Sequence, residues 1–173
     1  MHLEPPTLDD LPALHALIER SYRGESAKVG WSHEADLLGG QRTDLAALGE
    51  MLADPAQYLL IFRDNEHLRA CVALTDKGDG LAYLGMLTVD PKRQSAGLGR
   101  IMLAAAEDHA AAQLGATRIE MTVIVQRAEL IGWYERRGYA LTGQRRPFPD
   151  DPRFGLPKRD DLEFVVLEKK LTP

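Results

Sequence analysis

The stretch Val89-Asp90-Pro91-Lys92-Arg93-Gln94-Ser95-Ala96-Gly97-Leu98-Gly99 joins an apolar run to the most regular helical pattern in the sequence. Its Asp-Pro pair ends a predicted strand, and its last three residues open a predicted helix. Gly97 and Gly99 carry no side chain that would keep an anion away from the backbone. The first amides of a helix have no partners within it and lie at the positive end of the helix dipole. We therefore predict that a pyrophosphate binds here, with flanking charge from Lys92, Arg93 and Arg100.

Predicted helices and strands extend on both sides of this loop. Apolar residues at helical spacing predict one helix that ends near residue 22 and another between Thr43 and Pro55. Strands are predicted over residues 58–63, 68–75, 81–89, 118–125, 139–144 and 162–171, later helices over 97–114 and 128–137, and irregular chain over 23–42 and 145–161. This order predicts an α/β (α+β) fold with a mixed sheet in a single domain over residues 1–173. It does not fit the strict alternation of a doubly wound fold.

Composition and charge narrow the function classes. The chain has 173 residues, a hydrophobic fraction of 45% and a formal net charge of −5, which suit a globular domain but not nucleic-acid binding through phosphates. The acidic balance leans slightly toward neutral or cationic partners. The single cysteine, Cys71, cannot form an internal disulfide, and the histidines show no metal-ligand spacing. With no long apolar run and no signal-like start, we expect a cytoplasmic protein with no membrane association and no metal.

Three segments together resemble the GNAT superfamily of acetyltransferases. They are Leu87-Thr88-Val89-Asp90-Pro91, Gln94-Ser95-Ala96-Gly97-Leu98-Gly99 and Trp133-Tyr134-Glu135-Arg136-Arg137-Gly138-Tyr139, in the order and at the separation typical of that family. The resemblance is strongest over residues 81–144. It implies a single mixed, mostly antiparallel sheet with flanking helices, and an N-acetyltransferase that uses acetyl-CoA and releases coenzyme A.

The resemblance also implies how the cofactor would be held. The strands over 81–89 and 118–125 would splay apart, and the pantetheine arm would lie between them. Backbone groups of Leu87 and Val89 would bond this arm, and a strand amide near Leu87 would polarise the thioester carbonyl. The predicted cofactor-binding residues are Leu87, Thr88, Val89, Gln94, Ser95, Ala96, Gly97, Leu98, Gly99, Arg100 and Arg127.

Tyr134 matches the family position whose hydroxyl protonates the departing thiolate. General-acid help of this kind contributes about 10²-fold, since a thiol with a pKa of about 8.5 is already a fair leaving group. The alternative is that Tyr134 is a core residue of a short helix. Seven residues earlier the family often has Asn, where this chain has Arg127. The backbone makes that contact instead, or Arg127 reaches the cofactor phosphates.

Fewer signals mark the acceptor end. Attack on the thioester needs a neutral amine, and the strand over 81–89 lacks the acid that often serves as base in this family. Glu120 on the neighbouring strand is the predicted base, with Glu34 and Asp36 as alternatives. The predicted acceptor-binding residues are Trp31, Glu34 and Tyr83. Tyr22 and the Phe148-Pro149-Asp150-Asp151-Pro152 loop are further candidates. Core or surface packing is the favoured alternative for the three aromatic residues, and a solvated connection is the alternative for the loop.

The acceptor itself is predicted to be a small-molecule or peptide amine of open identity. Cys71 is expected to be a buried apolar residue and not an acetyl carrier. A possible homodimer would pair the final strand across two copies. The main alternative function is a non-catalytic acyl-CoA or metabolite-binding module of the same fold. A nucleotide-binding α/β domain is a further alternative, which NAD or ATP, but not coenzyme A, would occupy.

Overall fold

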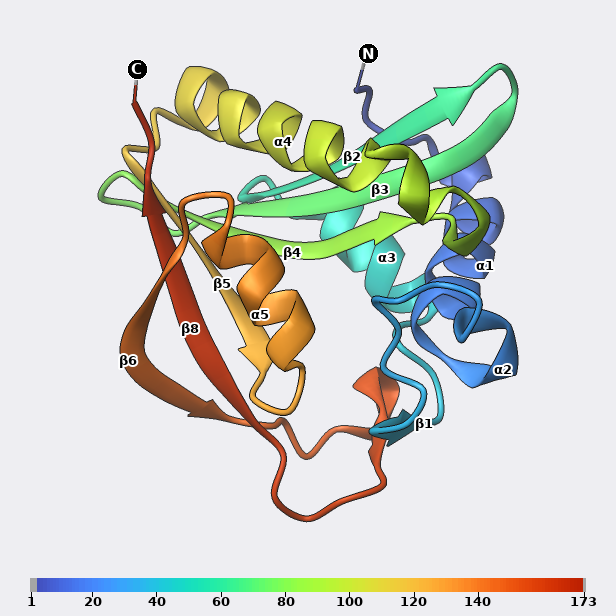
Figure 1. Cartoon of the computed structure of the whole chain (residues 1–173). Coiled ribbons are helices and arrows are strands. Elements are labelled where there is room, and N and C mark those ends of the chain that lie inside the picture. The colour runs from blue at the N-terminus through green and yellow to red at the C-terminus, as the bar shows by residue number, and fades with distance from the viewer. Residues whose placement is uncertain (1–2, 173) are drawn as a thin grey trace.

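A six-stranded sheet forms the centre of the computed structural model, which describes residues 3–172 (Figure 1). The strand order is β2-β3-β4-β5-β8-β6, and every neighbouring pair is antiparallel except β4 and β5. The strands are β2 (Gln57–Asp64), β3 (His67–Asp76), β4 (Leu81–Val89), β5 (Arg118–Ile124), β6 (Ala140–Pro147) and β8 (Glu163–Lys170). The predicted mixed, mostly antiparallel sheet is confirmed.

Helices cover both faces of this sheet. α4 (Leu98–Leu114) and α5 (Ala128–Glu135) pack on one face, and α1 (Leu11–Tyr22) and α3 (Leu45–Ala53) pack on the other (Figure 1). The alternating side chains of β3 divide the core between them. Ala70, Val72 and Leu74 belong to the cluster with α4, whereas Cys71 and Ala73 belong to the cluster with α1. Burial on both faces explains why β3 is an almost continuous apolar run.

The predicted helices agree closely with the observed ones. The buried stripe of α1 consists of the expected Leu11, Leu14, Leu17 and Ile18, and a 3₁₀ turn, η1 (Leu8–Asp10), precedes it. The helical spacing in α4 predicts that Ile101 shares the buried face with Leu98 and Met102, but Ile101 is exposed. The prediction was wrong there because the buried face is centred on Met102 and Ala106 and extends toward Leu103 and Ala110, away from Ile101.

β4 and β5 separate soon after they begin. Their parallel pairing joins Leu81–Tyr83 to residues 118–120 and goes no further, so the two strands diverge toward their carboxyl ends (Figure 1). β4 also contains a bulge, since Ala73 pairs with Gly85 but Cys71 pairs with Thr88. Met86 occupies the extra position with a φ of 54°, a left-handed conformation that is uncommon for a residue with a side chain. The bulge lies in the part of β4 beyond its last pairing with β5.

The two segments predicted to be irregular hold short elements. Residues 23–42 contain α2 (Gly24–Ala27) and β1 (Leu38–Gly39), and residues 145–161 contain η3 (Pro152–Phe154) and β7 (Leu156–Pro157). β1 and β7 pair with each other antiparallel, apart from the main sheet. β6 also continues to Pro147, beyond its predicted end at residue 144, because its last residues pair with the start of β8. The pairing of β1 with β7 joins residues that are more than 100 positions apart in the sequence, so it leaves no local sequence signal.

The final strand is an interior one. β8 lies between β5 and β6, so both of its edges are already paired. The expectation that it would pair across a dimer was therefore wrong, and the edges of the sheet are β2 and β6. Within residues 3–172, no helix combines the length and the apolar character needed to cross a membrane, and no cluster of three potential metal ligands occurs.

Candidate active site

A loop with uncapped amides leads into α4. The 3₁₀ turn η2 (Pro91–Ala96) follows β4, and Gly97 then adopts a φ of 74° as the N-cap of α4. Nothing lies within 4 Å of where a Cβ of Gly97 would stand, so the left-handed backbone and not crowding requires glycine there. The first helical hydrogen bond at this end runs from the Ile101 amide to the Gly97 carbonyl, which leaves the amides of the first turn to a ligand. The side chains of Ser95 and Ala96 lie outside what the structure describes.

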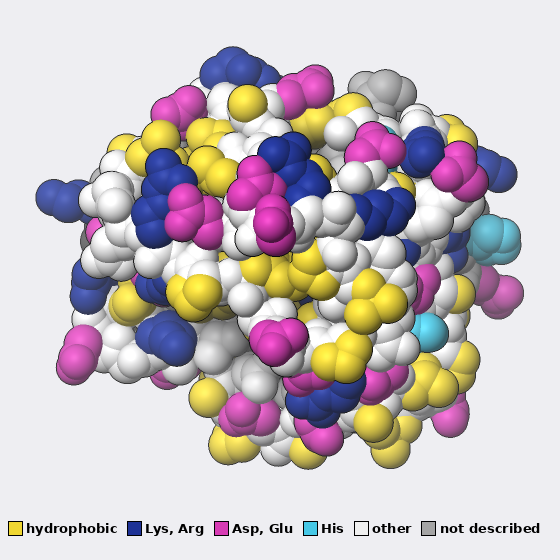
Figure 2. Space-filling model, turned by 90° about the horizontal axis from the view of Figure 1, so that it is seen from below, with side chains coloured by type: hydrophobic (Ala, Val, Ile, Leu, Met, Phe, Trp, Pro, Cys, Tyr) yellow, Lys and Arg dark blue, Asp and Glu magenta, His cyan; other side chains and the backbone are white. Residues whose placement is uncertain are grey.

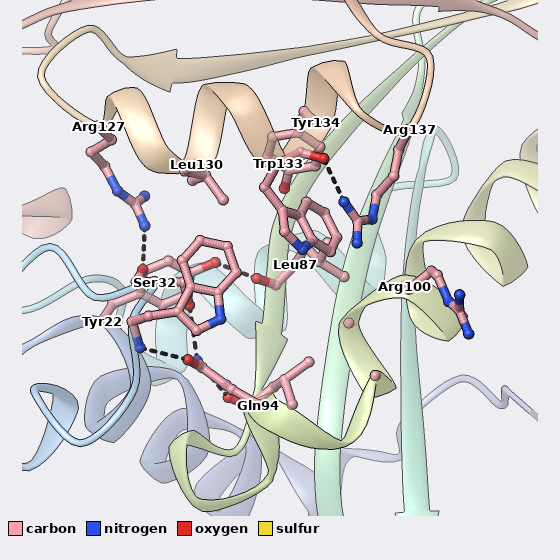
Figure 3. A pocket seen from close by; sticks show the side chains of 14 residues that line it. Tyr22, Ser32, Leu87, Gln94, Arg100, Arg127, Leu130, Trp133, Tyr134 and Arg137 are labelled. Carbon is pink, nitrogen blue, oxygen red and sulfur yellow. Dashed lines mark hydrogen bonds between the residues drawn. The ribbon is translucent and has the colours of Figure 1, made fainter.

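Gln94 ties this loop to the chain that follows α2. Its Oε1 accepts a hydrogen bond from the Trp31 amide at 2.9 Å, and its Nε2 donates to Ser32 Oγ at 2.8 Å and to the Val89 carbonyl at 3.3 Å (Figure 3). The packing is close, since a Cβ on Gly30 would stand 2.5 Å from Gln94 Oε1. The Gln94 side chain therefore shapes the loop, and any contact with a ligand is left to its backbone.

A chamber opens beside this loop. It is lined by Tyr22, Trp31, Ser32, Leu87, Val89, Gln94, Gly97, Gly99, Arg100, Arg127, Leu130, Trp133, Tyr134 and Arg137 (Figure 3). We call it the cofactor chamber. Two of its predicted members do not line it: Thr88 is buried, with its Oγ1 bonded to the Met86 carbonyl at 2.9 Å, and Leu98 packs in the core. Trp31, expected at the acceptor, instead lies here, with its ring 6.1 Å from that of Trp133.

Arg137 adds a charge to this chamber that sequence reasoning missed. Its guanidinium lies 3.6 Å from the centre of the Trp133 ring and donates to the Trp133 carbonyl at 2.6 Å. Burial, together with the positive charges of Arg136 and Arg100, lowers its pKa. Arg100 and Arg137 both line the chamber, where an anionic group would relieve their repulsion. The adjacent Arg136-Arg137 pair at the end of the tyrosine motif was the available signal.

The carbonyls along the open edge of β4 already have partners. The Leu87 carbonyl accepts a hydrogen bond of 2.6 Å from the Tyr22 hydroxyl. The Val89 carbonyl accepts from Gln94 Nε2 and from Ser21 Oγ, at 3.3 and 3.4 Å. A carbonyl oxygen has two lone pairs, so each can still accept another bond. These side chains fix the edge of the strand in place before any ligand enters.

A second chamber continues from the first. It is lined by residues from α1, the chain after it, β4, β5 and the loop after β6, and it shares with the cofactor chamber Tyr22, Leu87, Arg127, Leu130 and Tyr134. Phe148, Phe154, Phe164 and Tyr83 contribute aromatic walls, and the Tyr83 hydroxyl bonds to Thr122 Oγ1 at 2.7 Å. We call it the acceptor chamber. The predicted roles of Tyr83 and of the loop after β6 at this site agree with their positions.

Tyr134 lies where the two chambers meet. Its ring packs edge-on against Trp133 and Tyr139, with centroid distances of 5.0 and 5.6 Å. Burial, which outweighs the charge of Arg127, raises the pKa of Tyr134, so its hydroxyl keeps its proton across the physiological range. No hydrogen bond to this hydroxyl occurs within residues 3–172, in contrast to the engaged hydroxyl of Tyr22. Tyr134 therefore has a proton free to donate at the junction.

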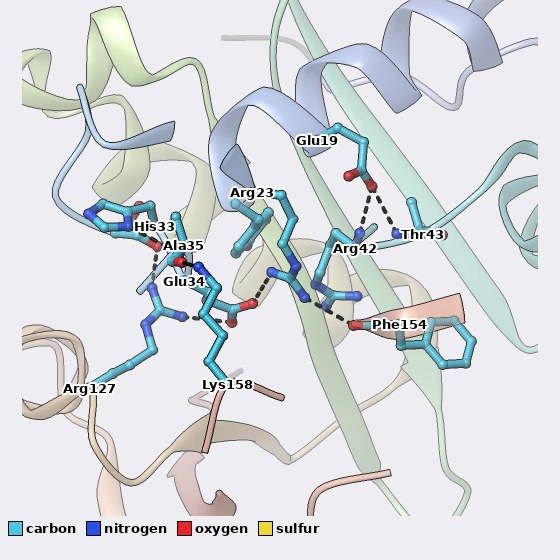
Figure 4. A network of polar contacts seen from close by, with 12 residues as sticks. Glu19, Arg23, His33, Glu34, Ala35, Arg42, Thr43, Arg127, Phe154 and Lys158 are labelled. Carbon is cyan, nitrogen blue, oxygen red and sulfur yellow. Dashed lines mark hydrogen bonds and ion pairs between the residues drawn. The ribbon is translucent and has the colours of Figure 1, made fainter. Parts of the chain in front are cut away.

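Glu34 is held by two arginines in the acceptor chamber (Figure 4). Its Oε2 accepts from Arg23 Nη1 at 2.5 Å, and its Oε1 accepts from Arg127 Nη1 at 3.0 Å. Burial alone would raise the pKa of Glu34, but the charges of Arg127, Arg42 and Arg23 outweigh it and lower the pKa below its ordinary value. Arg127 also donates to the Ser32 carbonyl. Its guanidinium is committed to this network and is not directed at cofactor phosphates.

The predicted base lies elsewhere. Glu120 is buried on β5, where its carboxylate accepts two hydrogen bonds from Arg146 at 3.0 and 3.2 Å, and it lines neither chamber. Asp36 is exposed and pairs with Lys28 at 3.6 Å. These placements do not support a base role for either residue.

The surface seen from below in Figure 2 mixes charges of both signs with hydrophobic side chains and carries no large single-sign area.

Comparisons with known proteins agree with this geometry. A family model described as the acetyltransferase (GNAT) family matches residues 11–139. No curated protein sequence matches the chain. Similar solved structures include a spermidine N-acetyltransferase from Vibrio cholerae in complex with CoA and spermine, at 17% identity and a TM-score of 0.71, covering 98% of this chain and 95% of that one. The ribosomal-protein-S18-alanine N-acetyltransferase from Escherichia coli is similar at 16% identity and a TM-score of 0.70, with coverage of 99% and 94%. A putative acetyltransferase from Desulfovibrio desulfuricans gives 15% identity and a TM-score of 0.72, with coverage of 99% of both chains.

Proposed function

Because the chain belongs to the acetyltransferase (GNAT) family, we propose that it transfers an acetyl group from acetyl-CoA to a primary amine by direct attack. The observation that carries this proposal is the junction of two chambers at Leu87 and Tyr134. One chamber begins at a helix start suited to a pyrophosphate, and the other is walled by aromatic and charged side chains. Two molecules can therefore enter from different sides and meet at one point.

The residues of the cofactor chamber fit coenzyme A. The first amides of α4, next to Gly97 and Gly99, suit the pyrophosphate, and Arg100 and Arg137 add positive charge beside it. The gap between β4 and β5 suits an extended arm that lies along β4 like an added strand. Acetyl-CoA supplies an acetyl group activated as a thioester. A backbone amide near the bulge at Met86–Leu87 would polarise its carbonyl.

Tyr134 would act as the general acid. Its hydroxyl borders both chambers, remains protonated and has no competing hydrogen bond among the described residues. Tyr22 also borders both chambers, but its proton is engaged by the Leu87 carbonyl. This difference favours Tyr134 as the residue that gives a proton to the departing thiolate.

The acceptor amine would lose its proton without a strong dedicated base. Among the residues that the structure describes, Glu34 is the one carboxylate that lines the acceptor chamber, and its lowered pKa makes it a weak base. The chamber is lined by Arg23, Arg42 and Arg127, whose positive charge disfavours the charged form of a bound amine. The arginines would thus raise the neutral, nucleophilic fraction of the amine.

Two measurements test the proposal. Isothermal titration with acetyl-CoA should give saturable heat, and release of free thiol should depend on both acetyl-CoA and an added amine. Absence of binding would overturn the assignment of the cofactor chamber. Binding without turnover over a broad amine panel would instead favour a non-catalytic acyl-CoA-binding module, and competition by NAD or ATP but not by coenzyme A would favour a nucleotide-binding domain.

A further inference from the structure

The acceptor chamber carries an excess of positive charge. Its charged lining residues are Arg23, Arg42, Arg127 and Glu34, so three positive charges face one negative charge, a difference of two (3 − 1). The chain as a whole has the opposite sign, with a formal net charge of −5. A chamber built for a polyamine or another purely cationic acceptor would need the reverse balance.

Two of the three arginines are already neutralised or engaged. Arg23 binds Glu34 and also donates to the Phe154 carbonyl at 3.0 Å, and only 5% of it is exposed. Arg127 binds the other oxygen of Glu34 and the Ser32 carbonyl. These contacts build the chamber wall, and each oxygen of Glu34 accepts a hydrogen bond from one of the two arginines.

Arg42 is the arginine left over. Within residues 3–172, its guanidinium has no hydrogen bond and no ion pair, and Figure 4 draws no dashed line to it. Among the described residues, the carboxylate of Glu19 forms no ion pair with this guanidinium, and its Oε1 instead accepts from the backbone amides of Arg42 and Thr43 at 2.7 and 3.0 Å. A half-buried, planar guanidinium with free donors is a receptor for a carboxylate or a similar anion.

Tyr22 sets the spacing between this charge and the reaction centre. The Arg42 guanidinium lies 5.4 Å from the centre of the Tyr22 ring, and the hydroxyl of the same ring bonds to the Leu87 carbonyl. One tyrosine ring therefore separates Arg42 from the junction of the chambers. If the amine of a bound acceptor lies at Leu87, the part of the same acceptor that reaches Arg42 is only a few bonds away from the amine nitrogen.

We propose that the acceptor is an amino acid-like molecule, a primary amine whose carboxylate binds Arg42 and whose apolar body packs on Phe148, Phe154 and Phe164. This inference rests on the proposed acetyl transfer and names the substrate class of the same site. The excess of positive charge in the chamber favours an acceptor with a carboxylate. The single Tyr22 ring between Arg42 and the junction requires that carboxylate to lie close to the amine. The phenylalanine walls favour an apolar body for the rest of the molecule.

Matched pairs of amines that differ in the carboxylate test the proposal. We expect L-phenylalanine to exceed phenethylamine, and L-leucine to exceed isoamylamine, by at least about tenfold in kcat/KM, as loss of a charge-assisted contact predicts. Arg42→Gln should reduce this ratio to near one. Arg42→Lys, which keeps the charge but loses the planar fork, should give an intermediate ratio.

A control variant isolates the effect of the chamber. Arg145 is an exposed arginine of β6 that pairs with Glu163 and lines neither chamber. Arg145→Gln removes the same charge and should leave the ratio at the wild-type value. Thermal unfolding of the variants checks that each one is folded before its ratio is interpreted.

The outcomes separate this inference from the function on which it rests. Equal or better turnover of the decarboxylated amines would overturn the proposal that the acceptor carries a carboxylate, while the proposed acetyl transfer would still stand. A preference for phosphoethanolamine over β-alanine would show that Arg42 binds a phosphate and not a carboxylate, and would also overturn the proposal. An unchanged ratio in Arg42→Gln would remove Arg42 from the site. Failure of acetyl-CoA to bind in isothermal titration would instead overturn the proposed function.

Discussion

The Tyr22 hydroxyl donates a hydrogen bond of 2.6 Å to the Leu87 carbonyl, which joins the last residue of α1 to the open edge of β4. This bond settles the orientation of one of the two tyrosines that border both chambers. The other, Tyr134, faces the same junction with its hydroxyl proton unengaged among the described residues. The two phenols therefore border the same junction, and they differ in that the Tyr22 proton is engaged by the Leu87 carbonyl.

Removing the Tyr134 hydroxyl should affect chemistry more than binding. Tyr134→Phe is expected to lower kcat about 10²-fold, because the leaving thiolate loses its proton donor. The Kd for acetyl-CoA in isothermal titration should stay close to the wild-type value. Tyr22→Phe is the matched control, and we expect it to lower the free energy of unfolding by about 1 kcal/mol with a much smaller loss of kcat. Equal losses of kcat in the two variants would contradict the general-acid assignment.

Alanine variants of the two glycines at the ends of α4 can distinguish an effect of backbone strain from an effect on ligand binding. Gly97 and Gly115 both have a positive φ, 74° and 63°, and neither has an atom within 4 Å of the position of a Cβ. Replacing either one by Ala should cost about 1–2 kcal/mol in the free energy of unfolding, from the left-handed conformation. Gly97→Ala should also weaken acetyl-CoA binding, since the methyl group would point into open space beside the phosphate loop. If titration shows equal affinities for the two variants, the loop does not hold the cofactor.

Arg137 should contribute to cofactor affinity. Arg137→Gln is expected to raise the Kd for coenzyme A about tenfold or more, since a hydrogen bond to a charged group is worth about 1.5–3 kcal/mol. Arg136 is exposed, adjacent in sequence and absent from the chamber lining, so Arg136→Gln provides the control. Titration at low and high salt should show a weaker salt dependence for Arg137→Gln than for the wild type. A similar Kd for all three proteins would exclude Arg137 from the site.

Acid should weaken the arginine network around Glu34. The pKa of Glu34 in the folded protein lies below its ordinary value of 4.5, so its contribution to stability is fully present above pH 4.5 and is lost as the pH falls through the folded pKa. Glu34→Gln leaves Arg23 and Arg127 without their partner, and we expect a loss of about 3 kcal/mol or more in the free energy of unfolding at neutral pH.

The pH dependence of that loss is the test. Urea unfolding of both proteins at several values between neutral pH and pH 3 should show the difference shrinking as the pH falls below 4.5. Other carboxylates titrate in both proteins and cancel in the difference. A difference that is constant with pH would show that Glu34 is not charged in the native state.

Cys71 should play no part in catalysis. It is buried against α1, and burial raises the pKa of its thiol to about 12, so the reactive thiolate is scarce at neutral pH. Iodoacetamide should modify it slowly in the native protein and rapidly in denaturant. Cys71→Ala should retain kcat, as direct attack on the thioester requires. Loss of turnover in a folded Cys71→Ala protein would point instead to an acetyl-cysteine intermediate.

Local sequence predicted the cofactor end far better than the acceptor end. The bounds of β4 agree with prediction because a continuous apolar run stops at Asp90-Pro91, and the start of α4 agrees because Gly97 marks it. The acceptor chamber has no comparable signal. Arg23 meets Glu34 and Phe154, partners that are 11 and 131 residues away, and Arg127 meets Glu34 across 93 residues. Contacts of that range arise from the topology and not from a motif.

The misplaced residues show the same limit. Trp31 was expected at the acceptor, but Gln94 bonds its amide and draws it over the cofactor chamber. Glu120 was expected to act as base, but the alternation of β5 directs it to Arg146. An aromatic or acidic residue can be assigned to an active site from sequence, yet the side of a strand or loop on which it lies is set by its partners.

The pairing of β1 with β7 has a consequence for how one wall of the acceptor chamber keeps its shape. That wall carries Phe148 and Phe154 and stands apart from the six-stranded sheet. It is held by the two-residue strands β1 and β7, by the hydrogen bond from Arg23 to the Phe154 carbonyl and by the one from Lys158 to the Ala35 carbonyl. We therefore expect that a substitution that breaks one of these contacts changes the outline of the chamber, while the strands of the main sheet keep their pairing.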